Sequence, residues 1–110
     1  MSMDFDPGGL THRVAIERPV RTEDGAGGAS IAFEPFATVW AAIEPLSANE
    51  DGASGRLATR VTHRVTIRWR ADLTGAMRLR HRGRILRIAS LRDADESRRF
   101  LVIEAEEERI

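Results

Sequence analysis

The chain of 110 residues contains no cysteine, which excludes a disulfide framework and any metal site built on thiolates. It also lacks a run of about 20 apolar residues, the length that a membrane-spanning helix requires. The first ten residues, MSMDFDPGGL, have neither a basic start nor an apolar stretch, so we expect no signal peptide and no membrane contact. These absences fit one domain that is synthesised in the cytosol.

Lysine is absent as well, so all 17 basic residues are arginine, and 17 acidic residues balance them to a net charge of zero. The zero total hides a strong segregation along the chain. Residues 1–55 carry nine acids and three arginines, residues 56–92 eleven arginines and one acid, and residues 93–110 seven acids and three arginines. Such a chain can pair its segments internally as neighbouring strands, or present opposite charges to copies of itself and to other partners.

The basic segment opens with RVTHRVTIRWR, residues 60–70, which alternates with a period of two. One side of this stretch is mainly apolar and carries Val61, His63, Val65, Ile67 and Trp69. The other side is polar and carries Arg60, Thr62, Arg64, Thr66, Arg68 and Arg70. This pattern predicts a β-strand with one buried face and one arginine face.

Further strands are expected at residues 12–20, around Ile31 and Phe33, and over residues 36–46, 76–91 and 99–108. Pro19 should end the first strand or place it at a sheet edge. Turn signals lie at residues 22–30, where the first two strands could form a long hairpin, at Arg82 with Gly83, and at residues 93–98. A helix is an alternative for residues 36–46, which are rich in alanine, and a short helical turn is an alternative within residues 47–58. The fold class is therefore all-β: a small antiparallel β-barrel or sandwich of about six or seven strands, with an N-terminal arm at residues 1–11 and a long loop at residues 46–58.

A search for catalytic and metal-binding motifs finds no persuasive set. His12, His63 and His81 are far apart in the sequence, and none has metal-ligand spacing to another histidine or a carboxylate. No Gly-x-Ser-x-Gly and no phosphate-binding Gly-x-x-x-x-Gly-Lys motif occurs. His63 lies on the apolar side of its strand, which favours a buried, hydrogen-bonded side chain. We expect no catalysis, no metal and no cofactor.

The arginines allow three readings. They can pair across strands with Glu104, Glu106 and their neighbours, contact another protein, or bind nucleic-acid phosphates. The chain has only six aromatic residues, and they are not interleaved on the basic face as a base-stacking platform requires. Trp40 and Trp69 lie within apolar strand patterns, so we predict that both pack in the core, with an interface as the alternative.

The order of motifs is informative as a whole: GGLTHRVAI, DGAGG, FATVWAAIEPLSANE, HRVTIRWRADLTGAMRLRHRGRILRI and a terminal acidic strand. From about residue 8 to residue 107 this series resembles the phage head–tail joining family. These are small head-completion or stopper proteins of long-tailed phages and gene transfer agents. Phe33 stands where the family favours tryptophan, and Trp69 where tyrosine is more usual.

The resemblance implies a single connector β-barrel domain over residues 1–110 that forms a homo-oligomeric ring, a hexamer or dodecamer, at the neck of a virion or virion-like particle made in the bacterial cytoplasm. Such a ring would lie below the portal or adaptor protein, continue the channel for double-stranded DNA, and dock a tail terminator or tail tube protein. A non-catalytic role is implied. The rival function is a small β-barrel that binds nucleic acid directly.

In this family a long loop reaches toward the channel. The matching stretch is residues 47–58, and the residues assigned to the channel by resemblance are Ser47, Asn49, Glu50, Asp51 and Arg56. The charge segregation adds candidates for contacts with neighbouring subunits or partners, namely Arg60, Arg64, Arg68, Glu104 and Glu106.

Overall fold

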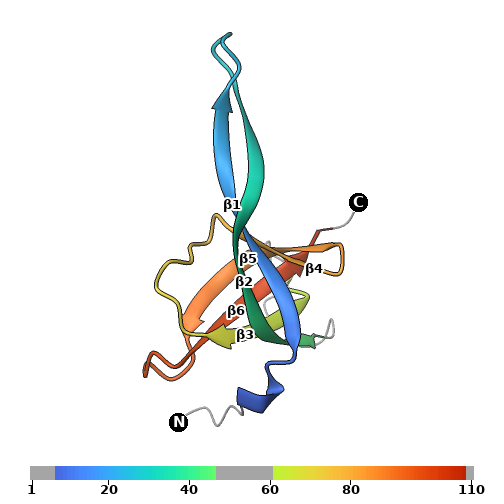
Figure 1. The fold of residues 1–110 in the computed structure, drawn as a ribbon, viewed down its shortest axis with the longest axis vertical. Helices are drawn as coiled ribbons and strands as arrows, with labels where there is room; N and C mark the ends of the chain where they lie inside the picture. The colour runs from blue at the N-terminus through green and yellow to red at the C-terminus, as the bar shows by residue number, and fades with distance from the viewer. Residues whose placement is uncertain (1–6, 47–60, 109–110) are drawn as a thin grey trace, which may run out of the picture.

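The computed structural model describes residues 7–46 and 61–108, which form six antiparallel strands closed into one barrel in the order β1-β2-β3-β6-β5-β4 (Figure 1). The elements are the short 3-10 helix η1 (Pro7–Gly9) and the strands β1 (His12–Glu23), β2 (Ala29–Pro45), β3 (His63–Arg68), β4 (Arg78–His81), β5 (Arg84–Asp93) and β6 (Phe100–Glu107). The predicted all-β barrel is confirmed, and residues 36–46 are extended rather than helical. No helix in the described ranges is long and apolar enough to cross a membrane.

The barrel core is built from alternating apolar residues of all six strands. Its members include Val14, Ile16, Ala41, Val65, Ile67, Leu79, Leu86, Leu101, Ile103 and Ala105. On β3 the predicted alternation holds for His63, Val65 and Ile67, which are all buried. Thr66, expected on the solvent side, is buried too. It lies opposite Val102 of β6 in the register, and Val102 is also buried, so this part of the outer face is covered.

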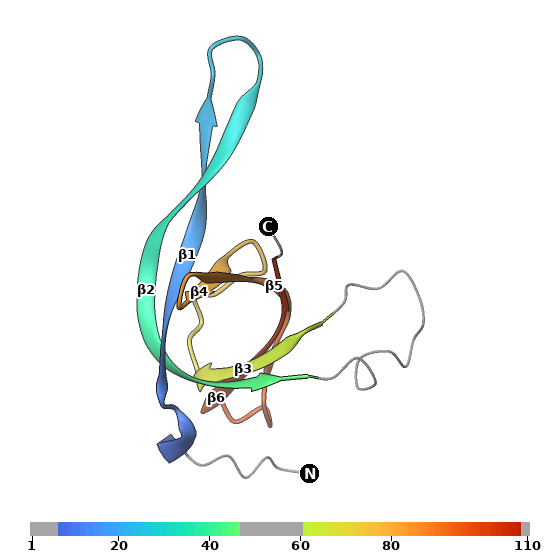
Figure 2. The same cartoon turned by 90° about the vertical axis from the view of Figure 1, so that its right-hand side faces the viewer.

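β1 and β2 continue beyond the barrel as a long two-stranded hairpin, which projects from one end of the molecule (Figures 1 and 2). The sequence predicted two strands over the residues of β2, but they form one strand of 17 residues that passes through Pro35. β1 likewise passes through Pro19. Both prolines are tolerated because no third strand from the described part of the chain joins the projecting part: β1 pairs with β4 only at residues 15–17, and β2 pairs with β3 only at residues 41–45. Pro19 therefore lies at a sheet edge, one of the two predicted outcomes.

The hairpin turn is held by the Asp24 side chain. Its Oδ1 atom accepts hydrogen bonds from the amides of Ala26 at 2.8 Å and Gly28 at 3.0 Å. These backbone hydrogen bonds lower the pKa of the Asp24 carboxyl below its ordinary value. Gly25 and Gly27 have φ angles of 79° and 88°, a region that glycine enters without the steric cost of a Cβ. The predicted DGAGG loop is thus a hairpin turn.

Candidate functional site

The arginine face of β3 contains Arg64, whose guanidinium lies between carboxylates of the two neighbouring strands. Its Nη1 atom donates to Glu44 Oε1 of β2 at 3.2 Å, and Nη2 lies 4.0 Å from Glu104 Oε2 of β6. Glu104 is directly opposite Arg64 in the β3–β6 register. Opposite charges at such positions contribute about 0.2–1 kcal/mol each, so the geometry matches the cross-strand reading for Arg64.

The other predicted contact residues lie apart from this pair. Arg68 ends β3 with an exposed side chain, and Glu106 on β6 lies opposite Arg87 of β5. Arg60 lies outside the described residues, as do all five predicted channel residues, Ser47, Asn49, Glu50, Asp51 and Arg56. Among the predicted contact residues that the structure describes, only Arg64 and Glu104 are brought together, and all of the partner-contact and channel assignments stay predictions.

Trp40 lies on the outer face of the barrel with half of its side chain exposed, so the prediction that it packs in the core is wrong. On β2 the neighbouring positions Val39 and Ala41 face the core, and the strand period of two turns Trp40 outward. Arg13 pairs with Trp40 across β1 and β2, and its guanidinium carbon lies 4.8 Å from the indole ring centroid. An exposed tryptophan stacked by arginine is typical of protein interfaces.

Two hollows adjoin Trp40 and Arg68. One of about 380 Å³ is also lined by Leu10 and Thr11, and another of about 270 Å³ is also lined by Trp69. Trp69 itself packs against the core cluster, as predicted. The surface formed by Arg13, Trp40 and Arg68 is here called the Trp40 surface. It combines an exposed aromatic ring and two arginine side chains with two adjoining hollows.

A second charged cluster lies where the hairpin leaves the barrel. The Glu17 carboxylate accepts hydrogen bonds from Arg78 Nε at 2.7 Å and Arg80 Nε at 3.0 Å, with 12% of the Glu17 side chain exposed. Burial by itself raises the pKa of the Glu17 carboxyl, but the two arginines outweigh it and the pKa lies below its ordinary value. Arg78 also stacks on Phe33, 3.9 Å from the ring centroid. The cluster fixes the base of the hairpin to β4.

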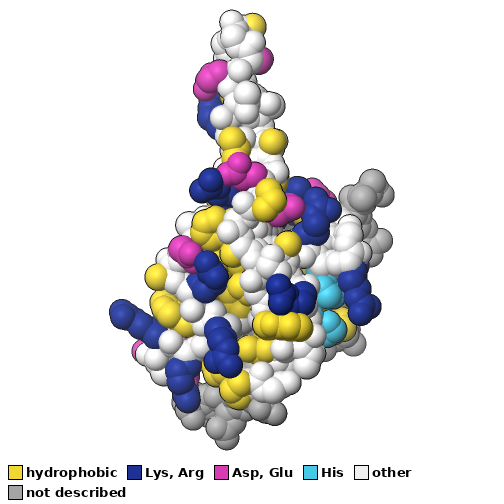
Figure 3. Space-filling view, in the orientation of Figure 1, with side chains coloured by type: hydrophobic (Ala, Val, Ile, Leu, Met, Phe, Trp, Pro, Cys, Tyr) yellow, Lys and Arg dark blue, Asp and Glu magenta, His cyan; other side chains and the backbone are white. Residues whose placement is uncertain are grey.

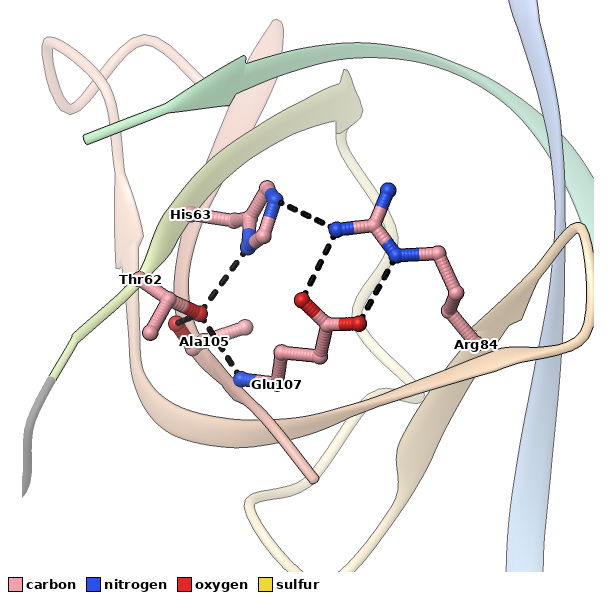
Figure 4. A network of polar contacts seen from close by, with 5 residues as sticks. All are labelled: Thr62, His63, Arg84, Ala105 and Glu107. Carbon is pink, nitrogen blue, oxygen red and sulfur yellow. Dashed lines mark hydrogen bonds and ion pairs between the residues drawn. The ribbon is translucent and has the colours of Figure 1, made fainter. Parts of the chain in front are cut away.

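His63 belongs to a polar network at the end of the barrel (Figure 4). Arg84 forms two hydrogen bonds of 2.8 Å with the Glu107 carboxylate, and its Nη2 atom lies 3.2 Å from His63 Nε2. Because arginine can only donate, Nε2 must be the acceptor and Nδ1 must carry the ring proton. His63 Nδ1 then donates to Thr62 Oγ1 at 2.9 Å, and the Glu107 amide donates to the same oxygen at 2.7 Å.

This network explains the protonation state of His63. Burial lowers the pKa of the imidazole, and the positive charge of Arg84 lowers it further. His63 is thus a buried, neutral, hydrogen-bonded residue, as its position in the alternation predicted. Its role is to join β3 to the β5 and β6 strands.

The other two histidines, His12 and His81, are far apart in the sequence, but their rings are in contact. The rings of His12 and His81 lie edge to face with centroids 5.2 Å apart, because β1 and β4 are neighbours in the barrel. His81 Nδ1 donates to the Arg13 carbonyl oxygen at 3.1 Å. Within residues 7–46 and 61–108, no group of three or more His, Asp or Glu side chains is placed to hold a metal ion.

The chain is similar to known proteins over nearly its whole length. A family model described as phage head completion protein matches residues 5–108. The solution structure of protein SF1141 from Shigella flexneri 2a is similar, with a TM-score of 0.75, 29% identity, and coverage of 94% of this chain and 96% of that chain. A chain from the virion of a native gene transfer agent particle has a TM-score of 0.66 and 26% identity, over 89% of this chain and 94% of that chain. A comparison with curated protein sequences gave no match.

Proposed function

The chain belongs to the phage head completion protein family, and on this premise we propose that it forms a ring at the neck of the particle. The ring would lie below the portal or adaptor protein, continue the DNA channel and dock the tail. The observation that carries this proposal is the family match over residues 5–108, nearly the whole chain. The similar chain from a gene transfer agent virion supports a place in a particle of this kind.

A ring of identical subunits needs two different surfaces on each copy, because head-to-tail contacts are heterologous. The barrel is suited to this role as a rigid block, since its strands close on one another and bury a common core. The Trp40 surface supplies one candidate contact. Arg68 is better placed than Arg64 to meet a neighbour, because Arg64 already lies between Glu44 and Glu104 of its own chain.

The proposal assigns residues 47–58 to the channel by family resemblance. Their composition supports this assignment, because Glu50 and Asp51 would repel DNA phosphates and Arg56 would moderate that repulsion. A channel through which DNA passes should not bind it tightly, so a mixed charge of this kind suits the role.

Direct nucleic-acid binding, the rival function, is less well supported by the described residues. Many arginines of the basic segment lie in ion pairs within the chain, namely Arg64, Arg70, Arg78, Arg80 and Arg84. Phosphates would have to compete with those carboxylates. Figure 3 shows arginine side chains spread over one face among acidic and hydrophobic side chains, not gathered into one basic stripe.

The direct test is removal of the chain from particles followed by complementation. Particles made without it should accumulate as heads that lack tails, and the purified chain added to those heads should restore joining. Normal tail joining without the chain would contradict the proposal. Titration of the isolated chain with duplex DNA at several salt concentrations tests the rival. Micromolar affinity with a steep salt dependence would favour direct nucleic-acid binding.

A further inference from the structure

Within residues 7–46 and 61–108, the projecting hairpin has two open edges, since its β1 and β2 portions pair only with each other. Among the described residues, β2 has no neighbouring strand on its outer edge between residue 29 and residue 40. The outer edge of β1 is open from residue 18 to residue 23. Open edges present backbone amides and carbonyls that an added strand can pair with.

The register shows which amides point outward. Asp24 N donates to Gly28 O at 3.1 Å, so this pair is hydrogen-bonded across the hairpin. In an antiparallel ladder such pairs alternate with non-bonded pairs, whose amides point away from the partner strand. Counting back from the turn, the outward pairs are Glu23 with Ala29, Arg21 with Ile31, and Pro19 with Phe33. Pro19 fits this assignment because it has no amide proton to donate.

The two edges differ in how they resist pairing. The β1 edge has lost one outward donor at Pro19 and carries the charged residues Arg21 and Glu23, which are joined by an ion pair. Proline and charge are common devices that discourage strand addition. The β2 edge keeps three consecutive outward donors, at Ala29, Ile31 and Phe33, before Pro35 ends the series. Residues 25–33 carry no charge.

The side chains along the β2 edge match an apolar partner. Outward residues of the hairpin place their side chains on a common face. On β2 this face carries Ile31, which is 56% exposed, and the half-buried Phe33, on whose ring Arg78 of the same chain stacks. In strand addition, the backbone supplies affinity and side chains at alternate positions supply specificity. The complementary ligand is therefore an extended segment without proline over about five residues, with apolar side chains at alternate positions.

We propose that the β2 edge of the hairpin, at residues 29–33, receives a β-strand from a different protein of the neck. A second copy of this chain fits less well. Pairing of two β2 edges is a two-fold contact that closes at a dimer and cannot build a ring. If the β2 edge paired with the β1 edge of a neighbouring copy, one hydrogen bond would be missing, because Pro19 has no amide proton to donate. This inference rests on the proposed function, because the partner is sought in the neck.

Hydrogen exchange measured by mass spectrometry, on the isolated chain and on purified particles, tests the inference without any substitution. In the isolated chain the outward amides at Ala29, Ile31 and Phe33 should exchange rapidly. In particles they should become protected, while those at Arg21 and Glu23 stay exposed. Rapid exchange of the β2 edge in particles that contain the chain would refute the inference alone, and absence of the chain from particles would refute the proposed function itself. Protection of the same edge in the concentrated isolated chain would identify a second copy as the occupant and would overturn the inference.

A pair of proline variants on one rung provides a matched test. Ile31→Pro removes an outward amide of the β2 edge, whereas Arg21→Pro removes the outward amide directly opposite on the β1 edge. Neither removes a backbone hydrogen bond within the hairpin, and the ion pair that Arg21→Pro also removes, between Arg21 and Glu23, lies at an exposed site. Ile31→Pro should weaken retention of the partner strand about fivefold to tenfold, as expected for one lost hydrogen bond, and Arg21→Pro should change it by less than about twofold. Ile31→Ala separates loss of the side chain from loss of the amide. Equal retention in the two proline variants would overturn the inference.

Discussion

The hydroxyl of Thr62 has the most clearly defined structural role in the polar network, and its removal gives a quantitative prediction. Thr62 Oγ1 accepts hydrogen bonds from His63 Nδ1 at 2.9 Å and from the Glu107 amide at 2.7 Å, and it lies 3.4 Å from the Ala105 carbonyl oxygen, to which it donates. Thr62→Val keeps the branched shape but removes the oxygen. Two donors, the His63 ring N–H and the Glu107 amide, then lose their partner.

Each buried donor left without a partner costs about 1–3 kcal/mol, and both sites here are partly buried, so Thr62→Val should lower the free energy of unfolding by about 2–3 kcal/mol. Urea denaturation followed by tryptophan fluorescence measures this difference. Thr38→Val on the exposed outer face of β2 is the matched control and should change the free energy by less than about 0.5 kcal/mol. A loss of less than about 0.5 kcal/mol for Thr62→Val would refute the assigned network.

The same network predicts a dependence of stability on pH. In the folded chain the pKa of His63 lies below the ordinary value of a histidine side chain, first because of burial and then because of the charge of Arg84. The unfolded chain therefore binds a proton before the folded chain does as the pH falls. The contribution of neutral His63 to the free energy of unfolding should be fully present above about pH 6.5. It should decline as the pH falls below that value, until the pH passes the folded pKa. His63→Gln should remove this part of the decline, and an unchanged pH profile in the variant would contradict the account.

Three further predictions concern other parts of the barrel, each measured by denaturation unless stated otherwise. Glu17→Gln should destabilise the chain by about 1–3 kcal/mol, because Arg78 and Arg80 lose a charged acceptor. The control Glu23→Gln, at an exposed site, should change the free energy of unfolding by less than about 0.5 kcal/mol. Equal effects of the two variants would refute the role of the Glu17 cluster. Arg82 and Gly83 both have positive φ angles, 53° and 77°, a region that asparagine and glycine tolerate better than other residues. Arg82→Asn should therefore raise the free energy of unfolding by about 0.5–1 kcal/mol, and Gly83→Ala should lower it by about 1 kcal/mol. Changes of the same sign in the two variants would be inconsistent with this turn. Trp40→Ala should cost less than about 1.5 kcal/mol in the isolated chain but reduce incorporation into particles, and normal incorporation would exclude the Trp40 surface as a contact.

The periodicity of the sequence was sufficient to predict an all-β fold, either a barrel or a sandwich, and the family resemblance favoured the barrel. Alternation over β3 identified its buried face, and turn chemistry located the hairpin at DGAGG and the tight turn at Arg82. The two strands predicted around Phe33 and Trp40 are one strand because Pro35 lies on an open edge, where a missing amide breaks no hydrogen bond. Openness of an edge depends on which strands lie beside it, and local sequence does not encode that.

The candidate site was less predictable for the same reason. Trp40 stands in an apolar run, and only the register with Arg13 and the closure of the barrel show that it faces outward. Glu17 could not be matched to Arg78 and Arg80 because more than 60 residues separate them, and pairing of β1 with β4 alone brings them together. Arg64 and Glu104 were predictable as opposite charges on two strands, although their register was not.

The central claim is that the chain forms a closed ring at the neck, and electron cryomicroscopy of native particles tests it most directly. A reconstruction of the neck should show copies of this six-stranded barrel arranged around the DNA channel, between the portal side and the tail. A well-resolved neck with no ring into which the barrel fits would contradict the account.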